Sequence, residues 1–297
     1  MLDDPDSRRQ RALRGARIDP ALAMTRAPSN ANEVWRGDEV VVRINVLEIG
    51  RLAREATIAS RAAREALVPP ILEVGNDGTI EWSVTRRVPG CDLGRAWRTL
   101  TPAFRERAIA ELAHALAALH ATPTDGLAGL DRAPPHTLPL EPLRALIAEL
   151  RDEHPHLADL LARCDAFVCA RWAAFDDADR GLAHGDPHLE NVLWDGAHVT
   201  ALLDLEWAQA TWLHADLEIL LALAAEPRRF ASADHETTID QADYVDVPRW
   251  LAAAYPGLFV HPRLDERLAV LRVSRELGLW ADHPHTSPLD PLVRAVT

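Results

Sequence analysis

The stretch of sequence that most constrains the fold is residues 182–208, LAHGDPHLENVLWDGAHVTALLDLEWA. Two short apolar runs, at 192–194 and 199–203, flank an Asp-Gly pair at 195–196. Asp-Gly between two apolar runs is a strong hairpin signal, so these residues are expected to form two antiparallel strands. The hairpin carries polar residues at both of its ends, and the ends of a hairpin lie side by side.

Three polar side chains are placed by this hairpin. Asn191 precedes the first strand, Asp204 follows the second, and Asp186 lies five positions before Asn191. We therefore expect Asn191 and Asp204 to converge, with Asp186 beside them. Carboxylate and amide oxygens suit Mg²⁺, which also keeps waters and phosphate oxygens as ligands. A carboxylate beside such a metal can accept the proton of a substrate hydroxyl during phosphoryl transfer.

The motif HGDPHLEN followed by LLDLEWA resembles the catalytic signature of the aminoglycoside phosphotransferase and choline kinase family, which is related to the protein kinases. In that family an H-G-D-x-x-x-x-N loop is followed by a strand that ends in I-D. The resemblance implies that Asp186 is the catalytic base, that Asn191 and Asp204 hold Mg²⁺, and that His184 braces the loop. It also implies transfer of the γ-phosphoryl group of ATP or GTP to a hydroxyl of a small molecule.

The same resemblance implies the fold class, which is α+β with two protein-kinase-like lobes. Residues 1–90 would form a small nucleotide-binding lobe with an antiparallel sheet. Within it, residues 1–27 are rich in Arg and Ala and are expected to form a leading helical segment. Residues 91–297 would form a larger, mostly helical lobe that carries the catalytic loop and the acceptor site.

Within the small lobe, VVVRI places Arg43 where the kinases carry the strand lysine that contacts the α- and β-phosphates, and RLAREA places Glu55 as its partner on the following helix. The chain contains no lysine, so any mechanism that needs a lysine amine is excluded. A guanidinium can hold phosphate in a bidentate manner. Two other interpretations stay open: Arg43 as a solvated charge at a strand end, and Glu55 as a partner of Arg51 or Arg54 on its own helix.

The remaining nucleotide contacts are also implied by the resemblance. Ser29 and Asn30, in SNAN, would form the loop over the phosphates, where kinases have glycines. In VTRRVPG, which resembles the kinase hinge, the backbone of Arg86 and Val88 would bind the purine and Thr85 would line the pocket behind it.

The rest of the chain alternates two patterns. Hairpins are predicted at 34–46, with a turn at Gly37–Asp38, and at 71–88, with a turn near Asn76–Gly78. A helical pattern covers 51–67 and ends at Pro69–Pro70. Further helices are predicted at 101–121, 141–178, 216–225, 248–254 and 264–280.

The charge balance bears on the partners. Asp and Glu number 45 against 32 arginines, a net charge of -13. Such a chain repels a phosphate backbone, so a nucleic-acid partner is not expected. The same acidity would attract a cationic acceptor, and it would equally serve solubility. The sequence predicts no oligomeric state.

Location follows from hydropathy. No apolar run of about 18 residues occurs, so no membrane span is expected. The first residues, MLDDPDSRRQ, lack the apolar stretch of a secretory signal, and a cytoplasmic location is predicted. The three cysteines lack CxxC spacing and indicate neither a disulfide framework nor a zinc site.

Two further acids have alternative interpretations. Glu206 is two residues beyond Asp204, and strand alternation would place both on one face, where Glu206 suits a second metal or a substrate contact. As an isolated acid it would equally be structural. Asp216 is expected to cap the helix that follows it.

An aminoglycoside or another antibiotic is the expected acceptor, which would make the protein a resistance enzyme. A metabolic acceptor such as an amino alcohol or a sugar is the alternative.

Two other classes of protein are less well supported by the sequence. His184, Asp186 and His188 form an H-x-D-x-H triplet that suits a transition metal, and GDPH at 185–188 is similar to the G-D-x-H element of binuclear metallophosphatases. The further His and Asn ligands of that phosphohydrolase class are missing. A catalytically inactive nucleotide-binding module is disfavoured by the intact set of Asp186, Asn191 and Asp204.

Overall fold

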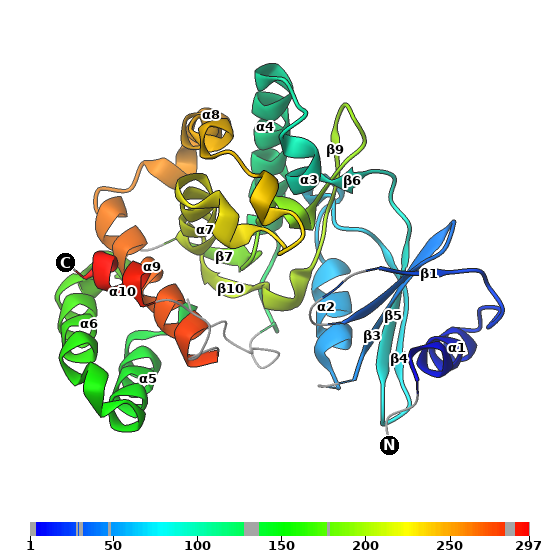
Figure 1. Cartoon of the computed structure of the whole chain (residues 1–297), viewed down its shortest axis with the longest axis horizontal. Helices are drawn as coiled ribbons and strands as arrows, with labels where there is room; N and C mark the ends of the chain where they lie inside the picture. Colours follow the sequence, from blue (N-terminus) through cyan, green and yellow to red (C-terminus); the bar gives the residue numbers. More distant parts are fainter. Residues whose placement is uncertain are drawn as a thin grey trace. The chain divides into compact units, whose positions relative to one another are not determined.

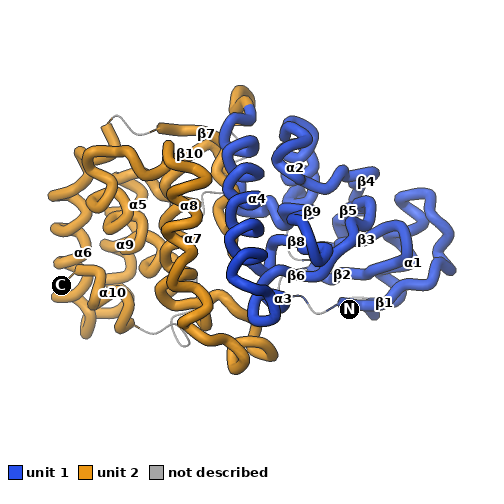
Figure 2. The backbone as a smooth tube through the Cα atoms, turned by 90° about the horizontal axis from the view of Figure 1, so that it is seen from above, with its two compact units in different colours: residues 1–122, 189–208 blue, residues 123–188, 209–297 orange. Residues whose placement is uncertain are grey.

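The computed structural model describes residues 4–27, 29, 32–46, 49–127, 137–176, 179–282 and 289–296. The chain divides into two compact units, coloured separately in Figure 2. Unit 1 comprises residues 1–122 and 189–208, and unit 2 comprises residues 123–188 and 209–297. The lobe boundary predicted at residue 90 falls inside unit 1, because residues 91–122 pack with the hairpin predicted at 192–203.

Unit 1 contains a five-stranded antiparallel sheet with the strand order β1-β2-β3-β5-β4. Both predicted hairpins are confirmed, one formed by β2 and β3 and the other by β4 and β5. The strands are β1 Thr25–Ala27, β2 Glu33–Arg36, β3 Val40–Asn45, β4 Ile71–Asn76 and β5 Glu81–Arg86. The prediction of one helical segment over 1–27 was wrong beyond residue 15, because helix α1 (Pro5–Gly15) ends there and residues 25–27 pair with β2 as a strand.

The two faces of this sheet have different chemistry because side chains alternate along each strand. Val42 and Ile44 of β3 are buried in an apolar cluster that includes Leu13 of α1 and Trp82 of β5. Arg43, between the two apolar residues, points to the opposite face. Helix α2 (Arg51–Ala59) packs against β4 and β5, and Figure 1 shows α1 and α2 on opposite sides of the sheet. The polar face of β3 is therefore the face covered by α2.

The rest of unit 1 supports the hairpin from which the site was predicted. The hairpin is confirmed as β8 (Val192–Trp194) and β9 (Val199–Leu202), and the short strand β6 (Cys91–Asp92) pairs with β8. Helix α3 is Leu93–Trp97, and α4 is Pro102–His120. The spacing of three and four residues between Ile109, Leu112, Leu116 and Leu119 predicts one buried face of α4, and all four side chains are buried.

Unit 2 is mostly helical and includes one two-stranded sheet, in which β7 (Arg180–Ala183) pairs with β10 (Gln209–Trp212). Its helices are α5 Leu140–Glu153, α6 Ala158–Arg171, α7 His214–Ala225, α8 Val247–Ala254, α9 Leu264–Asp282 and α10 Asp290–Ala295. The helical patterns predicted over 141–178 correspond to α5 and α6. The two helices are separated at His154, because the residue before a proline is disfavoured in the α conformation. In the described part of the chain no helix has both the length and the apolar character needed to cross a membrane.

Candidate active site

The ends of the β8–β9 hairpin meet as the sequence predicts. The N–H of Leu203 donates to the carbonyl oxygen of Asn191 at 2.8 Å, which places Asn191 beside the residue that precedes Asp204. Asp204 has a φ of 64°, a left-handed conformation that is uncommon outside glycine. Its side chain is 36% exposed and so remains accessible to a ligand.

An arginine on the sheet is the charged centre of unit 1. One terminal nitrogen of Arg43 donates to both carboxylate oxygens of Glu55, at 2.6 and 2.7 Å. Its other terminal nitrogen donates to Oδ1 of Asp204 at 3.0 Å. The predicted pairing of Arg43 with Glu55 is therefore confirmed, and the alternatives of a solvated Arg43 and of a Glu55 paired within its own helix were wrong. Burial lowers the pKa of Arg43, but the carboxylates of Glu55 and Asp204 outweigh it and raise that pKa above its usual value.

The position of α2 depends on a contact that the sequence did not reveal. Glu81, the first residue of β5, is buried and accepts hydrogen bonds from the N–H groups of Leu52 and Ala53, each at 2.9 Å. These are among the first N–H groups of the helix, which have no partner within it. Gly50 precedes the helix with a φ of 104°, a conformation that side-chain-bearing residues rarely adopt. Glu81 thus anchors the N-terminal end of the helix, and Glu55 follows in the middle of the same helix.

Glu206 lies close to Asp204, but the reason predicted for this was wrong. Strand β9 ends at Leu202, and residues 205–207 form a 3₁₀ turn, so strand alternation does not apply. The Glu206 carboxylate is buried and accepts from Arg51 at 2.6 Å, while its Oε2 lies 4.0 Å from Arg43. Burial and the neighbouring Asp204 carboxylate raise the pKa of Glu206 to about 7.

The donor set at the hairpin ends fits a magnesium ion. Three carboxylates, of Glu55, Asp204 and Glu206, face the guanidinium groups of Arg43 and Arg51. Asp204 and Asn191 supply the hard oxygen atoms that Mg²⁺ prefers, and waters and phosphate oxygens complete such sites. Among the described residues no three His, Cys, Asp or Glu side chains gather as a metal site.

The H-G-D loop belongs to unit 2 and is held by a buried carboxylate. The N–H groups of His184 and Gly185 donate to the two carboxylate oxygens of Asp216, each at 2.8 Å. Asp216 lies within α7 and is completely buried, and Leu213 is the N-cap, so the prediction that Asp216 caps the helix was wrong. Nδ1 of the buried His184 accepts from the N–H of Asp186 at 3.2 Å, a contact that braces the loop.

The Asp186 carboxylate has an accessible surface and a histidine neighbour. Its side chain is 35% exposed, and Nε2 of His188 lies 3.4 Å from its Oδ2. Both residues belong to the sequence motif, but from the sequence His188 was considered only as a metal ligand in the phosphohydrolase alternative. The structure adds His188 to the groups that touch the predicted base.

The structure places two of the residues predicted to contact the nucleotide, Ser29 and Thr85. Ser29 lies exposed between β1 and β2, and Asn30 lies outside the described residues. Thr85 occupies the same face of the sheet as Arg43, because Arg43 pairs with Ser83 two residues before it.

The predicted hinge begins at the end of β5. The N–H of Arg86 donates to the carbonyl oxygen of Pro70 at 3.3 Å and is thus used inside the sheet. The half-buried Val88 follows two residues later.

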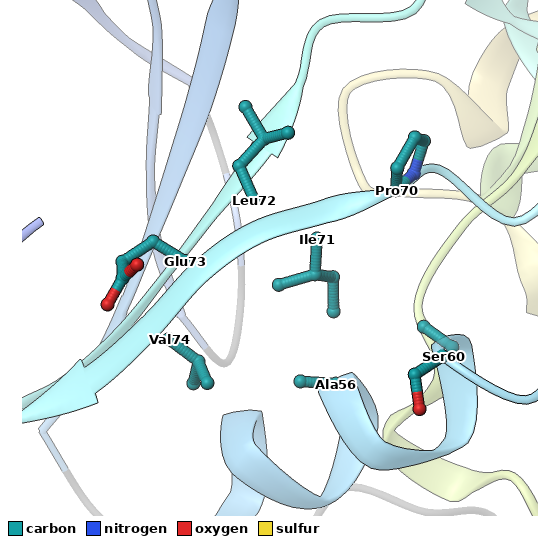
Figure 3. A pocket seen from close by; sticks show the side chains of 8 residues that line it. Ala56, Ser60, Pro70, Ile71, Leu72, Glu73 and Val74 are labelled. Atoms are coloured by element: carbon teal, nitrogen blue, oxygen red, sulfur yellow. The ribbon is translucent and has the colours of Figure 1, made fainter.

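A separate cavity of about 420 Å³ lies between α2 and β4 (Figure 3). Ile71 and Val74 point toward Ala56 of the helix. The lining is largely apolar and contains none of the residues predicted for catalysis or nucleotide binding. It is therefore distinct from the charged centre at Arg43.

The protein has the features of a kinase-like phosphotransferase. These are the arginine of the sheet paired with a glutamate of a helix, the H-G-D loop further along the chain, and the hairpin that ends in Asp204. The chain matches the model of the APH phosphotransferase enzyme family over residues 25–267, and it belongs to that family. No curated protein matches the sequence. The α+β, protein-kinase-like fold class expected from the sequence is confirmed by the structural comparisons below.

Three solved structures illustrate the likeness. The GDP complex of aminoglycoside 2'-phosphotransferase-IIIa is 13% identical, with a TM-score of 0.70 and coverage of 99% of this chain and 97% of that one. A thermostable mutant of APH(4)-Ia in complex with ADP and hygromycin B is 17% identical, with a TM-score of 0.63 and 98% coverage of both chains. A choline/ethanolamine kinase family protein from Mesorhizobium loti is 20% identical, with a TM-score of 0.59 and coverage of 92% and 86%.

A buried histidine near the loop makes the stability of the fold depend on pH. His214, in the first turn of α7, is 2% exposed, and its Nδ1 lies 3.4 Å from Arg267. Burial, together with the charges of Arg267 and His261, lowers the pKa of His214 to about 4. In the unfolded chain a histidine has a pKa of about 6.5. Between these values the unfolded chain binds the proton, so the free energy of unfolding falls as the pH decreases from 6.5 to 4.

We predict that replacing His214 with glutamine removes this pH dependence. The difference between the native and unfolded pKa of His214 corresponds to a decrease of up to about 3 kcal/mol in the free energy of unfolding between pH 7 and pH 4. His214→Gln should flatten that part of the profile, measured by urea unfolding at a series of pH values. His114→Gln, at an exposed position of α4, is the matched control and should leave the profile unchanged. An equally steep profile in His214→Gln would contradict the assignment.

Proposed function

We propose that this protein transfers the γ-phosphoryl group of ATP or GTP to a hydroxyl of a small molecule, and that the acceptor is an aminoglycoside or another antibiotic. Membership of the phosphotransferase family supports the reaction class. The observation that carries the proposal for this chain is the contact of Arg43 with both Glu55 and Asp204. It joins a phosphate-binding cation to a metal-binding carboxylate in unit 1.

In this proposal unit 1 holds the nucleotide. Arg43 binds the phosphates, and Glu55 keeps its guanidinium in place through two charged hydrogen bonds. Ser29 and Asn30 belong to the loop over the phosphates, and Thr85, Arg86 and Val88 line the purine site. Asp204 and Asn191 would hold Mg²⁺, which neutralises charge on the phosphates when bound.

Asp186 acts on the acceptor. It accepts the proton of the acceptor hydroxyl while that oxygen forms a bond to the γ-phosphorus. The bond from the γ-phosphorus to the bridging oxygen breaks, and the nucleoside diphosphate leaves with those electrons. His184 and Asp216 fix the loop backbone, so the Asp186 carboxylate is aimed before the acceptor arrives.

The acceptor class rests on charge and on likeness. The net charge of -13 favours a cationic molecule, and Glu206 is the candidate carboxylate for contacting it if Arg51 releases it. The APH(4)-Ia structure contains hygromycin B, which supports an aminoglycoside. The likeness to a choline/ethanolamine kinase family protein supports a second candidate, an amino alcohol of metabolism. A cytoplasmic location stays a prediction.

The direct experiment is a phosphorylation screen of aminoglycosides, other antibiotics, choline, ethanolamine and sugars with both ATP and GTP. We expect one acceptor to be phosphorylated, with Asp186→Asn lowering kcat by about 100-fold or more and leaving nucleotide affinity nearly unchanged. Asp204→Asn should instead weaken binding of the magnesium nucleotide. Near-normal turnover in Asp186→Asn would contradict the assignment of the base.

A second prediction concerns Arg43. Arg43→Ala should raise the nucleotide KM about tenfold or more, because it removes a charged hydrogen-bond donor from the phosphates. Glu55→Gln keeps the side-chain size but removes the charge that orients Arg43, so it should raise the KM less. An unchanged nucleotide KM in Arg43→Ala would show that another group binds the phosphates.

A third prediction tests the charge of the acceptor. For a cationic acceptor, kcat/KM at saturating nucleotide should fall steeply between 0.01 and about 0.3 M salt, since the Debye length shortens from about 30 Å to below 10 Å. A neutral substrate of the same enzyme, if the screen finds one, is the control. A flat salt profile for the best acceptor would leave the acidity as a solubility feature.

A further inference from the structure

Asp204 has a left-handed backbone conformation, which has an energetic cost in residues other than glycine. Its φ and ψ of 64° and 69° are left-handed, and only three non-glycine residues among those described have a positive φ. Such a conformation persists only where surrounding contacts impose it. The contacts that impose it are therefore part of the candidate site.

Helix α2 supplies those contacts to the residues that follow Asp204. The N–H of Leu205 donates to the Glu55 carboxylate at 3.2 Å. Arg54 donates from one terminal nitrogen to the carbonyl oxygen of Glu206 at 3.2 Å, and from the other to the carbonyl oxygen of Ala208. The backbone on the C-terminal side of Asp204 is thus held at three points, two of which are bonded to Arg54.

These contacts come from one face of the helix. Arg51, Arg54 and Glu55 are spaced by three and four residues and so project from the same side. Arg51 holds the side chain of Glu206, and Glu55 also holds Arg43. Arg54 differs from both because it binds backbone carbonyls, and it is buried, with 8% of its surface exposed.

We propose that Arg54 is a positioning residue for Asp204. It keeps the 206–208 backbone in the path that forces Asp204 into its left-handed conformation, and so it presents the Asp204 carboxylate to Mg²⁺. This inference rests on the proposed function, since it takes Asp204 as a magnesium ligand. Replacing a group that orients a metal ligand commonly lowers metal affinity by about 10- to 100-fold.

The test measures the dissociation constant of ADP by calorimetry, with Mg²⁺ and with a chelator, so it needs no acceptor and no turnover. The dissociation constant without Mg²⁺ divided by the constant with Mg²⁺ reports how strongly Mg²⁺ assists binding. Arg54→Met keeps the length and removes the donors, and it should lower this ratio about tenfold while changing the metal-free constant little. Arg54→Gln retains one donor and should give an intermediate ratio. Arg249→Met, at an exposed position of α8, controls for loss of a positive charge.

The outcomes separate the two proposals. If Asp204→Asn removes the magnesium effect and Arg54→Met does not change it, the positioning role is overturned and the metal assignment stands. If Asp204→Asn leaves the magnesium effect intact, the metal assignment in the proposed function fails. If Arg54→Met raises both dissociation constants by the same factor, or lowers only the melting temperature, Arg54 is merely structural and the inference is overturned. If Arg54→Met does not fold, the same comparison is made with Arg54→Gln.

Discussion

One guanidinium group, that of Arg43, connects three segments of unit 1, namely β3, α2 and the residues that follow β9. It bonds Glu55 on α2 and Asp204 after β9, and it is 84% shielded from solvent, since its side chain is 16% exposed. A charge in such a place must be paired, because removing one partner of a buried pair costs about 3–5 kcal/mol. The face of β3, the position of α2 and the path after the hairpin therefore depend on one another.

The structure meets this constraint with buried carboxylates that bind backbone N–H groups. Glu81 holds the first turn of α2, and Glu55 holds Leu205 as well as Arg43. In unit 2, Asp216 holds the N–H groups of His184 and Gly185. In each case a rigid element fixes a loop or a helix end that carries a candidate functional side chain. Because these side chains are already held in place, little conformational freedom has to be lost when a ligand binds.

The absence of lysine explains the form of the charged centre. An ammonium group is a compact charge with three donors, whereas a planar guanidinium presents donors on separate terminal nitrogens. Arg43 uses one nitrogen for Glu55 and the other for Asp204, so its orientation is specified at two points. In the proposed function this orientation is what would present the cation to the nucleotide phosphates, and Asp204 would exchange its arginine contact for the magnesium nucleotide.

The sequence by itself determined the local features. Hairpin signals such as the turn at 195–196 and the apolar spacing of α4 depend only on nearby residues, so they could be predicted. The motif that contains Asp186, Asn191 and Asp204 is equally local, and its resemblance to a known family led to the fold class and the family. Only the tertiary structure decided which polar groups meet. Asp216 bonds a loop about thirty residues earlier, Glu81 caps a helix that precedes it, and Arg54 reaches carbonyls about 150 residues away. These contacts arise where elements pack and leave no periodic signal in the chain, so a residue that looks like a helix cap or a surface charge takes its role from its neighbours in space.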